Sequence, residues 1–262
     1  MVAREFVGTV IAVEPAMGDA VLLTFSCPPE VAASAQAGRV VRLLCRDDHS
    51  FDPLLPRSFP LYDASPNSGP LTVLVQPTDR GSSWLAERQV GDRLTAFGLF
   101  GNAFMMTPKA LNLLLIAGGQ KVAPLVMLAR TAIESGRNVT FLMGAGSDED
   151  LLLPSRLPAD VEYVVTTDDG SHGHSGVVTD LVPSYIRWAD QVFASGPAAM
   201  YRSLQAHLKA HRIGEHPRAQ VMIDRQITCG FGVCLGCIVE TRCGPAAACV
   251  QGPIFDLDDV VW

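Results

Sequence analysis

The sequence lacks a run of basic residues, and its overall charge is acidic. Lys and Arg number 20 against 27 Asp and Glu, which gives a formal net charge of −7 at pH 7. Because nucleic-acid affinity depends on clustered Lys and Arg, this balance argues against a general nucleic-acid binder. Internal repeats and low-complexity tracts are also missing. With 48% hydrophobic and 18% charged residues, we expect packed domains rather than disorder.

A long uninterrupted apolar run is missing too. The most apolar stretch, residues 111–129, is broken by two glycines, a glutamine, a lysine and Pro124, whereas a membrane span needs about 20 apolar residues. The first residues form an alternating pattern with charges at Arg4 and Glu5, which is typical of a strand and not of a secretory signal. We therefore expect a cytoplasmic protein with no membrane partner, whose seven cysteines do not form a disulfide framework.

Three patterns follow one another along the chain and predict a multi-domain protein. Residues 1–105 carry short β-type runs between Gly- and Pro-rich turns, which favours a β-barrel. Residues 106–220 alternate apolar strands with helices, which is typical of an α/β domain with a parallel sheet. Residues 221–262 hold five of the seven cysteines in a stretch too short for its own core, which indicates a small metal-stapled domain.

The individual elements can be predicted from these patterns. We expect strands at 6–13, 20–25, 40–45, 71–76, 112–117, 138–143, 161–166 and 191–194, and helices at 124–135 and 198–210.

The cysteines of the last region have a distinctive spacing. Cys229, Cys234 and Cys237 form a C-x4-C-x2-C motif, and Cys249 follows after eleven intervening residues. This is the plant-type ferredoxin spacing, in which one loop and one distant cysteine hold a [2Fe–2S] cluster. Glycines inside the motif permit the backbone angles that turn three thiolates inward, and they let backbone N–H groups approach the sulfurs. The motif therefore predicts a [2Fe–2S] cluster on these four cysteines.

Two alternatives to this ligand set stay open. Four cysteines also suit a structural zinc ion, although zinc sites usually begin from paired C-x2-C motifs and this chain has one. Cys243 competes with Cys249 for the fourth position. We prefer Cys249 because residues 250–255 after it resemble a strand that would anchor the ligand.

Further motifs precede the cysteines in a fixed order. They are an arginine followed by an aromatic at 57–61, a glycine with two hydroxyls at 80–85, two closing glycines at 97–102, and a glycine-rich strand–helix turn at 118–124. Together with the barrel and the terminal cysteine motif, this order resembles the ferredoxin reductase superfamily. Within it, the chain resembles the electron-transfer subunits of class 1B dihydroorotate dehydrogenase over essentially its whole length.

The resemblance implies a β-barrel that binds FAD, an α/β nucleotide-binding domain and a C-terminal [2Fe–2S] domain. It implies an oxidoreductase subunit that relays electrons between NAD(P)H, FAD and the cluster, with an FMN-containing dihydroorotate dehydrogenase catalytic subunit as the expected partner in pyrimidine biosynthesis. No residue of this chain is assigned a catalytic role. The cofactor-binding residues that the resemblance implies are Arg57, Ser58, Phe59, Pro60, Leu74, Val75, Gln76, Gly81, Ser82, Gly118 and Gly119.

Two positions depart from the family pattern at the nicotinamide site. Lys121 stands where relatives carry the third glycine of the turn after the first strand, and Ser195 stands where they carry a cysteine. A side chain at position 121 would block the pyrophosphate or, as a cation, contact a phosphate. Two interpretations therefore stay open, a working nicotinamide site and a domain kept for packing and partner contact.

Two rival functions also stay open. The chain would serve another partner if it were the reductase subunit of a hydrogenase or of a ferredoxin:NADP oxidoreductase. A non-enzymatic module with structural zinc would be colourless and contain no flavin.

Overall fold

The computed structural model describes residues 5–47, 49–65, 69–210 and 218–262. The chain groups into two compact units. The first comprises Met1–Ala103, Asp224–Ile238 and Ala246–Pro253, and the second comprises Phe104–Ile223, Val239–Pro245 and Ile254–Trp262. Residues 221–262 thus contribute to both units, while the three-domain division at 105 and 220 stays a prediction. Within the described ranges, no helix is long and apolar enough to cross a membrane.

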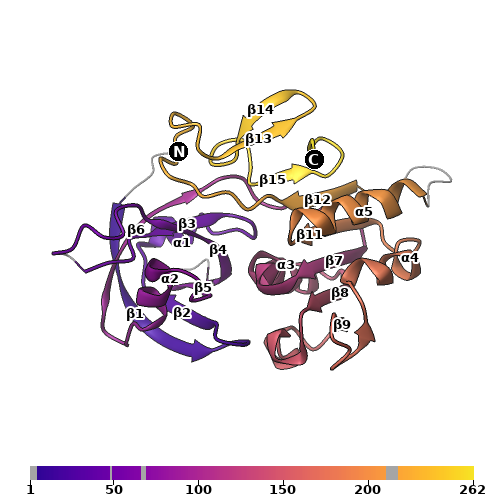
Figure 1. The fold of residues 1–262 in the computed structure, drawn as a ribbon, viewed down its shortest axis with the longest axis horizontal. Helices are drawn as coiled ribbons and strands as arrows, with labels where there is room; N and C mark the ends of the chain where they lie inside the picture. The colour runs from indigo at the N-terminus through magenta and orange to yellow at the C-terminus, as the bar shows by residue number, and fades with distance from the viewer. Residues whose placement is uncertain (1–4, 48, 66–68, 211–217) are drawn as a thin grey trace. The chain divides into compact units, whose positions relative to one another are not determined.

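The first unit is built on a closed barrel of six antiparallel strands in the order β1-β2-β5-β4-β3-β6 (Figure 1). Strand β1 pairs with both β2 and β6, and this double pairing closes the barrel. Residues along β1 alternate between exposed and buried, as expected for a strand with one face on a core. The strands and helices are β1 (Glu5–Pro15), β2 (Val21–Phe25), α1 (Pro29–Ala32), β3 (Val40–Leu43), β4 (Arg57–Ala64), β5 (Leu71–Val75), α2 (Arg80–Ala86) and β6 (Arg93–Phe100).

The second unit is built on a seven-stranded sheet in the order β10-β9-β8-β7-β11-β12-β15. All neighbouring strands are parallel except the last pair, in which β15 runs antiparallel to β12. Its strands are β7 (Asn112–Gly118), β8 (Asn138–Ala145), β9 (Val161–Thr167), β10 (His174–Ser175), β11 (Gln191–Ser195), β12 (Arg218–Met222) and β15 (Ile254–Asp256), and its α-helices are α3 (Ala123–Glu134), α4 (Val182–Tyr185) and α5 (Ala198–Ala210). Short 3-10 helices cover Gly119–Val122, Asp148–Asp150, Pro154–Arg156 and Val178–Leu181.

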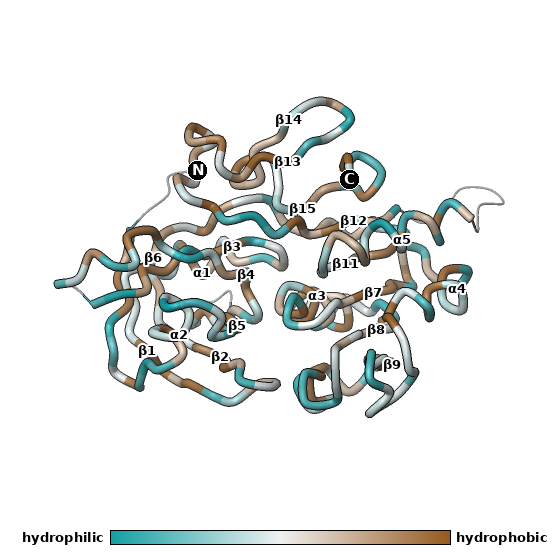
Figure 2. The backbone as a smooth tube through the Cα atoms, in the orientation of Figure 1, coloured by the Kyte–Doolittle hydropathy of each residue, from teal (hydrophilic) through white to brown (hydrophobic). Residues whose placement is uncertain are grey.

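Strand β7 lies in the middle of this sheet because it is apolar along almost its whole length. The hydrophobic run is visible as brown colour in Figure 2, and residues Leu113 to Ala117 are fully buried. Sheet order reverses between β7 and β11, since β8 to β10 extend on one side and β11 to β15 on the other. The carboxyl ends of strands at such a switch point are where open α/β sheets bind ligands.

The observed elements agree with most of the predictions and extend them. All eight predicted strands and both predicted helices are present, with bounds that differ by a few residues. The strand expected over 250–255 is wrong in extent, because only Ile254–Asp256 is a strand and the preceding residues form a turn. The last region also contains β13 (Ile238–Thr241) and β14 (Gly244–Ala247), which pair as a two-stranded sheet.

Candidate functional site

The four cysteines of the predicted cluster lie in the first unit, where the motif loop contacts Cys249. Their thiols act on one another electrostatically, Cys234 on Cys229 and both Cys237 and Cys229 on Cys249. Among the described residues, no three Cys, His, Asp or Glu side chains converge on one point as ligands of a single ion would. A tetrahedral zinc site needs four ligands around one centre, whereas each iron of a [2Fe–2S] cluster takes two thiolates. Four thiols that gather around one loop without converging on one point therefore fit the two-iron cluster.

The loop that carries three of these cysteines adopts the conformation that its glycines allow. Gly230 and Gly232 have φ angles of 81° and 76°, and Leu235 has a φ of 57° without being glycine. This geometry turns backbone N–H groups toward the sulfurs. The N–H of Phe231 donates to Cys229 Sγ over 3.4 Å, and that of Gly232 donates to Cys249 Sγ over 3.2 Å. Such hydrogen bonds stabilise negative sulfur.

The same contacts change the acidity of the thiols. The backbone N–H groups of Phe231 and Cys234 lower the pKa of Cys229 to about 6. Burial raises the pKa of Cys249 to about 11, and the neighbouring thiol of Cys237 adds to the rise. Metal binding requires the thiolate form, which the backbone N–H groups favour at Cys229 and which burial opposes at Cys249.

Cys249 is better placed than its rival Cys243 for the fourth position. Cys249 is buried at 3% exposure and its sulfur accepts a hydrogen bond from the motif loop. Cys243 is exposed between β13 and β14. The choice of Cys249 as ligand stays a prediction that these contacts favour.

The cysteine loop is attached to the barrel by two polar side chains from neighbouring strands. Arg42 of β3 stands opposite Ser58 of β4 in the register, so both point to the same face of the barrel wall. Arg42 Nη1 donates to the Cys229 carbonyl over 3.3 Å. Ser58 Oγ donates to the Ile227 carbonyl over 3.4 Å and accepts from the Ile227 N–H over 3.2 Å.

The residues predicted to bind the flavin therefore face different parts of the first unit. Ser58 faces the cysteine loop, whereas Arg57 turns toward helix α2. Arg57 Nε donates to Asp79 Oδ2 over 2.7 Å, and Asp79 Oδ1 accepts the Ser82 N–H over 2.8 Å. Arg57 and Ser82 thus lie around one carboxylate, and Gly81 lies between Asp79 and Ser82 at the start of α2. The roles of Ser58, Phe59, Pro60, Leu74 and Val75 stay predictions.

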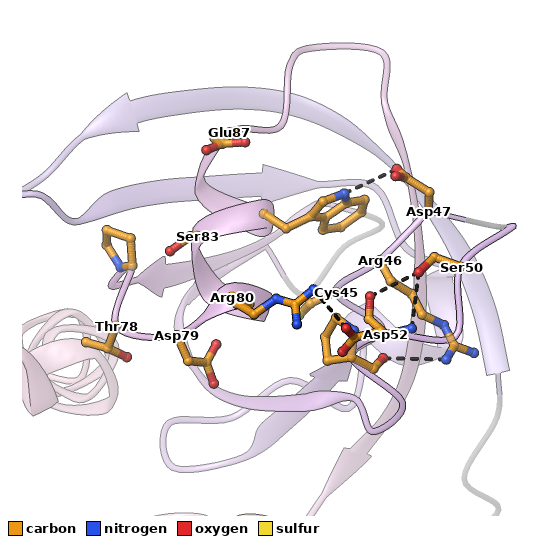
Figure 3. A pocket seen from close by; sticks show the side chains of 13 residues that line it. Cys45, Arg46, Asp47, Ser50, Asp52, Thr78, Asp79, Arg80, Ser83 and Glu87 are labelled. Carbon is orange, nitrogen blue, oxygen red and sulfur yellow. Dashed lines mark hydrogen bonds and ion pairs between the residues drawn. The ribbon is translucent and has the colours of Figure 1, made fainter.

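A pocket of about 490 Å³ opens beside the start of α2 (Figure 3). Its lining carries two cations, Arg46 and Arg80, and four carboxylates, those of Asp47, Asp52, Asp79 and Glu87. Arg80 Nη2 lies 2.8 Å from an oxygen of Asp52, a pair with both side chains well exposed.

Two observations test whether FAD fits this part of the barrel. The Oε1 atom of Gln76 is buried and has no hydrogen-bond partner within the described ranges, so the end of β5 offers an acceptor to a ligand N–H. The Asp79 carboxylate accepts hydrogen bonds from Arg57 and Ser82, two donors that a phosphate oxygen would also use. Burial opposes ionisation of Asp79, but the Ser82 N–H and the Arg57 guanidinium outweigh it and lower its pKa. The Arg57 and Ser82 donors are therefore grouped at one point, as binding of a diphosphate requires, with the Asp79 carboxylate between them.

The glycines predicted at the nucleotide site lie at the switch point of the second unit. A Cβ on Gly118 would lie 2.7 Å from Pro197 Cδ and 3.0 Å from Met200 Sδ, so this glycine lets β7 approach the turn after β11. Gly119 has a φ of 58°, and a Cβ added there would meet no atom within 4 Å, which leaves its backbone open to a ligand. Lys121 is half-buried in the 3-10 turn that follows, and Ser195 ends β11 with 3% exposure.

Comparison with known proteins places this architecture in a family. Over 217 residues the chain is 31% identical to the protein named dihydroorotate dehydrogenase B (NAD(+)), electron transfer subunit, of Bacillus caldolyticus, which covers 81% of this chain and 82% of the relative. The chain belongs to the family of dihydroorotate dehydrogenase B electron transfer subunits. The like-named protein of Desulforamulus reducens is 27% identical over 99% of both chains. Residues 224–261 match the model of the iron–sulfur cluster binding domain of dihydroorotate dehydrogenase B.

Solved structures agree with the fold. The structure of an NADH-dependent reduced ferredoxin–NADP oxidoreductase superposes with a TM-score of 0.82 at 26% identity, covering 97% of this chain and 90% of that one. A ferredoxin NADP+ reductase from Neisseria gonorrhoeae, solved with bound FAD and NADP, has a TM-score of 0.62 at 16% identity and covers 81% and 95%. The predicted ferredoxin-reductase fold with a C-terminal iron–sulfur domain is confirmed.

Sequence reasoning missed two residues of these sites. Arg42 is a charged residue within the otherwise apolar strand β3, and this break in the apolar run is the signal that could have identified it as a site residue. Asp79 precedes the predicted glycine turn, and its place as an N-cap could be read from the Ser three residues later.

Proposed function

We propose that this chain is the electron-transfer subunit of a dihydroorotate dehydrogenase that uses a nicotinamide nucleotide, with FAD and a [2Fe–2S] cluster as resident cofactors. The observation that carries the proposal is that a loop with three cysteines is fastened to the barrel and donates a backbone hydrogen bond to the sulfur of the fourth, Cys249. We further propose that the chain works in the cytoplasm and serves pyrimidine biosynthesis, as its resemblance to this family implies.

FAD would supply the exchange between two-electron and one-electron transfer, and the cluster would supply the single-electron carrier. The chain's own residues hold these groups. Arg57, Gly81 and Ser82 would bind the flavin diphosphate at the start of α2, while the end of β5 presents the Gln76 acceptor. Cys229, Cys234, Cys237 and Cys249 would hold the irons, and the N–H groups of Phe231 and Gly232 support the sulfur charge.

A nicotinamide nucleotide would bind at the carboxyl ends of β7 and β11. The open backbone at Gly119 and the cation of Lys121 both suit phosphate groups at this edge. The Lys121 ammonium group would therefore contact a phosphate of the nucleotide, in place of the backbone contact that a glycine at this position would allow. This interpretation favours a working site over a domain kept only for packing.

The partner would dock on the cysteine loop. Phe231, Val233 and Leu235 of that loop expose 59%, 76% and 63% of their surfaces, and Val250 beside Gly232 exposes 57%. Apolar side chains at such exposure mark an interaction surface. The occupant we propose is the FMN-containing catalytic subunit, which would oxidise dihydroorotate while this chain exchanges the electrons.

The test is an anaerobic visible spectrum of the purified chain before and after NADH, followed by dithionite. Flavin and iron–sulfur bands that bleach with NADH support the complete relay. If the bands bleach only with dithionite, the chain holds FAD and a cluster but NADH is not its reductant. A colourless protein overturns the proposal. Reconstitution with the catalytic subunit should then give NAD+ reduction that depends on dihydroorotate.

A second candidate has one observation in its favour. The reduced ferredoxin–NADP oxidoreductase superposes on almost the whole chain. A reductase subunit of that kind would pass electrons to ferredoxin instead. Reduction of added ferredoxin without any response to the dihydroorotate dehydrogenase subunit would favour this candidate.

A further inference from the structure

Arg42 of the barrel wall carries a buried charge. Its residue is 7% exposed, and its Nε atom is buried without a hydrogen-bond partner. None of the ion pairs among the described residues involves it. Arginines are rarely buried unless they are paired, because removing a charge from water is costly. Within the described part of the chain, the counter-charge of Arg42 is therefore not an Asp or Glu side chain.

The surroundings of the guanidinium identify the counter-charge. Arg42 Nη1 bonds the carbonyl of Cys229, and the guanidinium carbon lies 5.4 Å from the centres of both the Phe97 and Phe100 rings. The rings hold the cation in place through their negative faces. The carbonyl that the guanidinium bonds belongs to Cys229, a ligand of the proposed cluster, so the anionic cluster would lie next to Arg42.

A [2Fe–2S] cluster on four thiolates is an anion, and it gains one further negative charge when one electron enters. A fixed cation at its edge stabilises the reduced form more than the oxidised form, because the attraction grows with the charge of the cluster. Arginine stays protonated in proteins, so its charge does not depend on the ionisation state of its neighbours. The low exposure of Arg42 limits screening by solvent and salt.

We propose that Arg42 is the counter-charge of the [2Fe–2S] cluster, a positioning residue of the barrel wall that raises the cluster's reduction potential. The inference rests on the cluster of the proposed function and adds a residue from outside the cysteine motif. Electrons that reach the flavin are thereby drawn toward the cluster. The step concerned is the addition of one electron to the oxidised cluster, with dithionite as the reductant in the test and the flavin in the relay.

The experiment is a redox titration of the full chain, loaded with FAD and cluster, followed by electron paramagnetic resonance of the reduced cluster. In Arg42→Gln, we expect about a tenfold shift of the reduction equilibrium toward the oxidised form, which is a fall of about 59 mV for one electron. Arg42→Lys keeps the charge and should stay near the wild-type midpoint. Arg93→Gln is the matched control, because Arg93 is exposed at the start of β6, whereas the rings of Phe97 and Phe100 that contact Arg42 lie in the second half of that strand.

An unchanged midpoint reduction potential of the cluster in Arg42→Gln overturns the proposal. An equal fall of that potential in Arg93→Gln overturns it as well. If Arg42→Gln fails to hold iron, the iron content of Arg42→Lys decides. Iron retained by Arg42→Lys supports the counter-charge, whereas iron lost from both variants with normal FAD content means that Arg42 only packs, and this overturns it. A wild-type chain without a cluster would instead refute the proposed function, so the two failures differ.

Discussion

Replacing Gly230 by alanine tests how tightly the cysteine loop is fitted to the barrel. Gly230 has a φ of 81°, and a Cβ there would overlap the ring of Phe100, which is 2% exposed. The ring in turn carries the Arg42 guanidinium. A methyl group at position 230 therefore has to displace either the loop or a buried aromatic side chain.

The magnitude has two parts. A left-handed backbone costs a residue with a Cβ roughly 1–2 kcal/mol. Overpacking against a buried ring costs a further 1–3 kcal/mol or so. We therefore expect Gly230→Ala to destabilise the loop by about 2–5 kcal/mol, a large share of the roughly 5–15 kcal/mol that stabilises a folded protein.

Gly244→Ala is the matched control. Gly244 has a φ of 104° and no atom within 4 Å of an added Cβ, so its alanine variant has the backbone cost without the collision. We expect it to lose about 1–2 kcal/mol. The difference of about 1–3 kcal/mol corresponds to a melting temperature lower by about 2–12 °C in Gly230→Ala than in Gly244→Ala.

The assay is visible circular dichroism of the cluster bands during heating, with iron counted per chain beforehand. Gly230→Ala should hold less iron and lose its bands at the lower temperature. If the two variants melt together with equal iron, the contact between Gly230 and Phe100 does not limit cluster binding, and the reasoning is refuted.

Three further predictions concern the ligands of each site. Cys249→Ser should lose the cluster while Cys243→Ser keeps it, as iron and sulfide per chain would report; the reverse result would make Cys243 the ligand. Asp79→Asn keeps the helix cap but removes a negative charge beside the diphosphate, so FAD should bind about three- to tenfold more tightly in a fluorescence titration. Weaker FAD binding would mean that the Asp79 charge supports the site. Lys121→Met should weaken NADH binding about tenfold, measured by anaerobic bleaching against NADH concentration, whereas tighter binding would show that the side chain obstructs the nucleotide.

Much of the fold and the centre of the site could be predicted from the sequence, because their causes are local. The C-x4-C-x2-C spacing and its glycines act within one loop, so chain-neighbouring residues specify the cluster. Apolar runs such as that of β7 specify buried parallel strands in the same way. Strand β15 was harder, because three residues with no strong pattern become a strand only by pairing with the edge of an existing sheet.

Tertiary structure alone decided what surrounds the cluster. Arg42 and Cys229 lie 187 residues apart, and only the barrel register and the path of the loop bring them together. The same holds for Ser58, which the strand's alternation directs to Ile227 while Arg57 next to it turns toward Asp79. The sequence by itself therefore determined which groups this protein binds. The packing of distant segments decided the charges and contacts around them, since electrostatic interactions depend on distance in space and not along the chain.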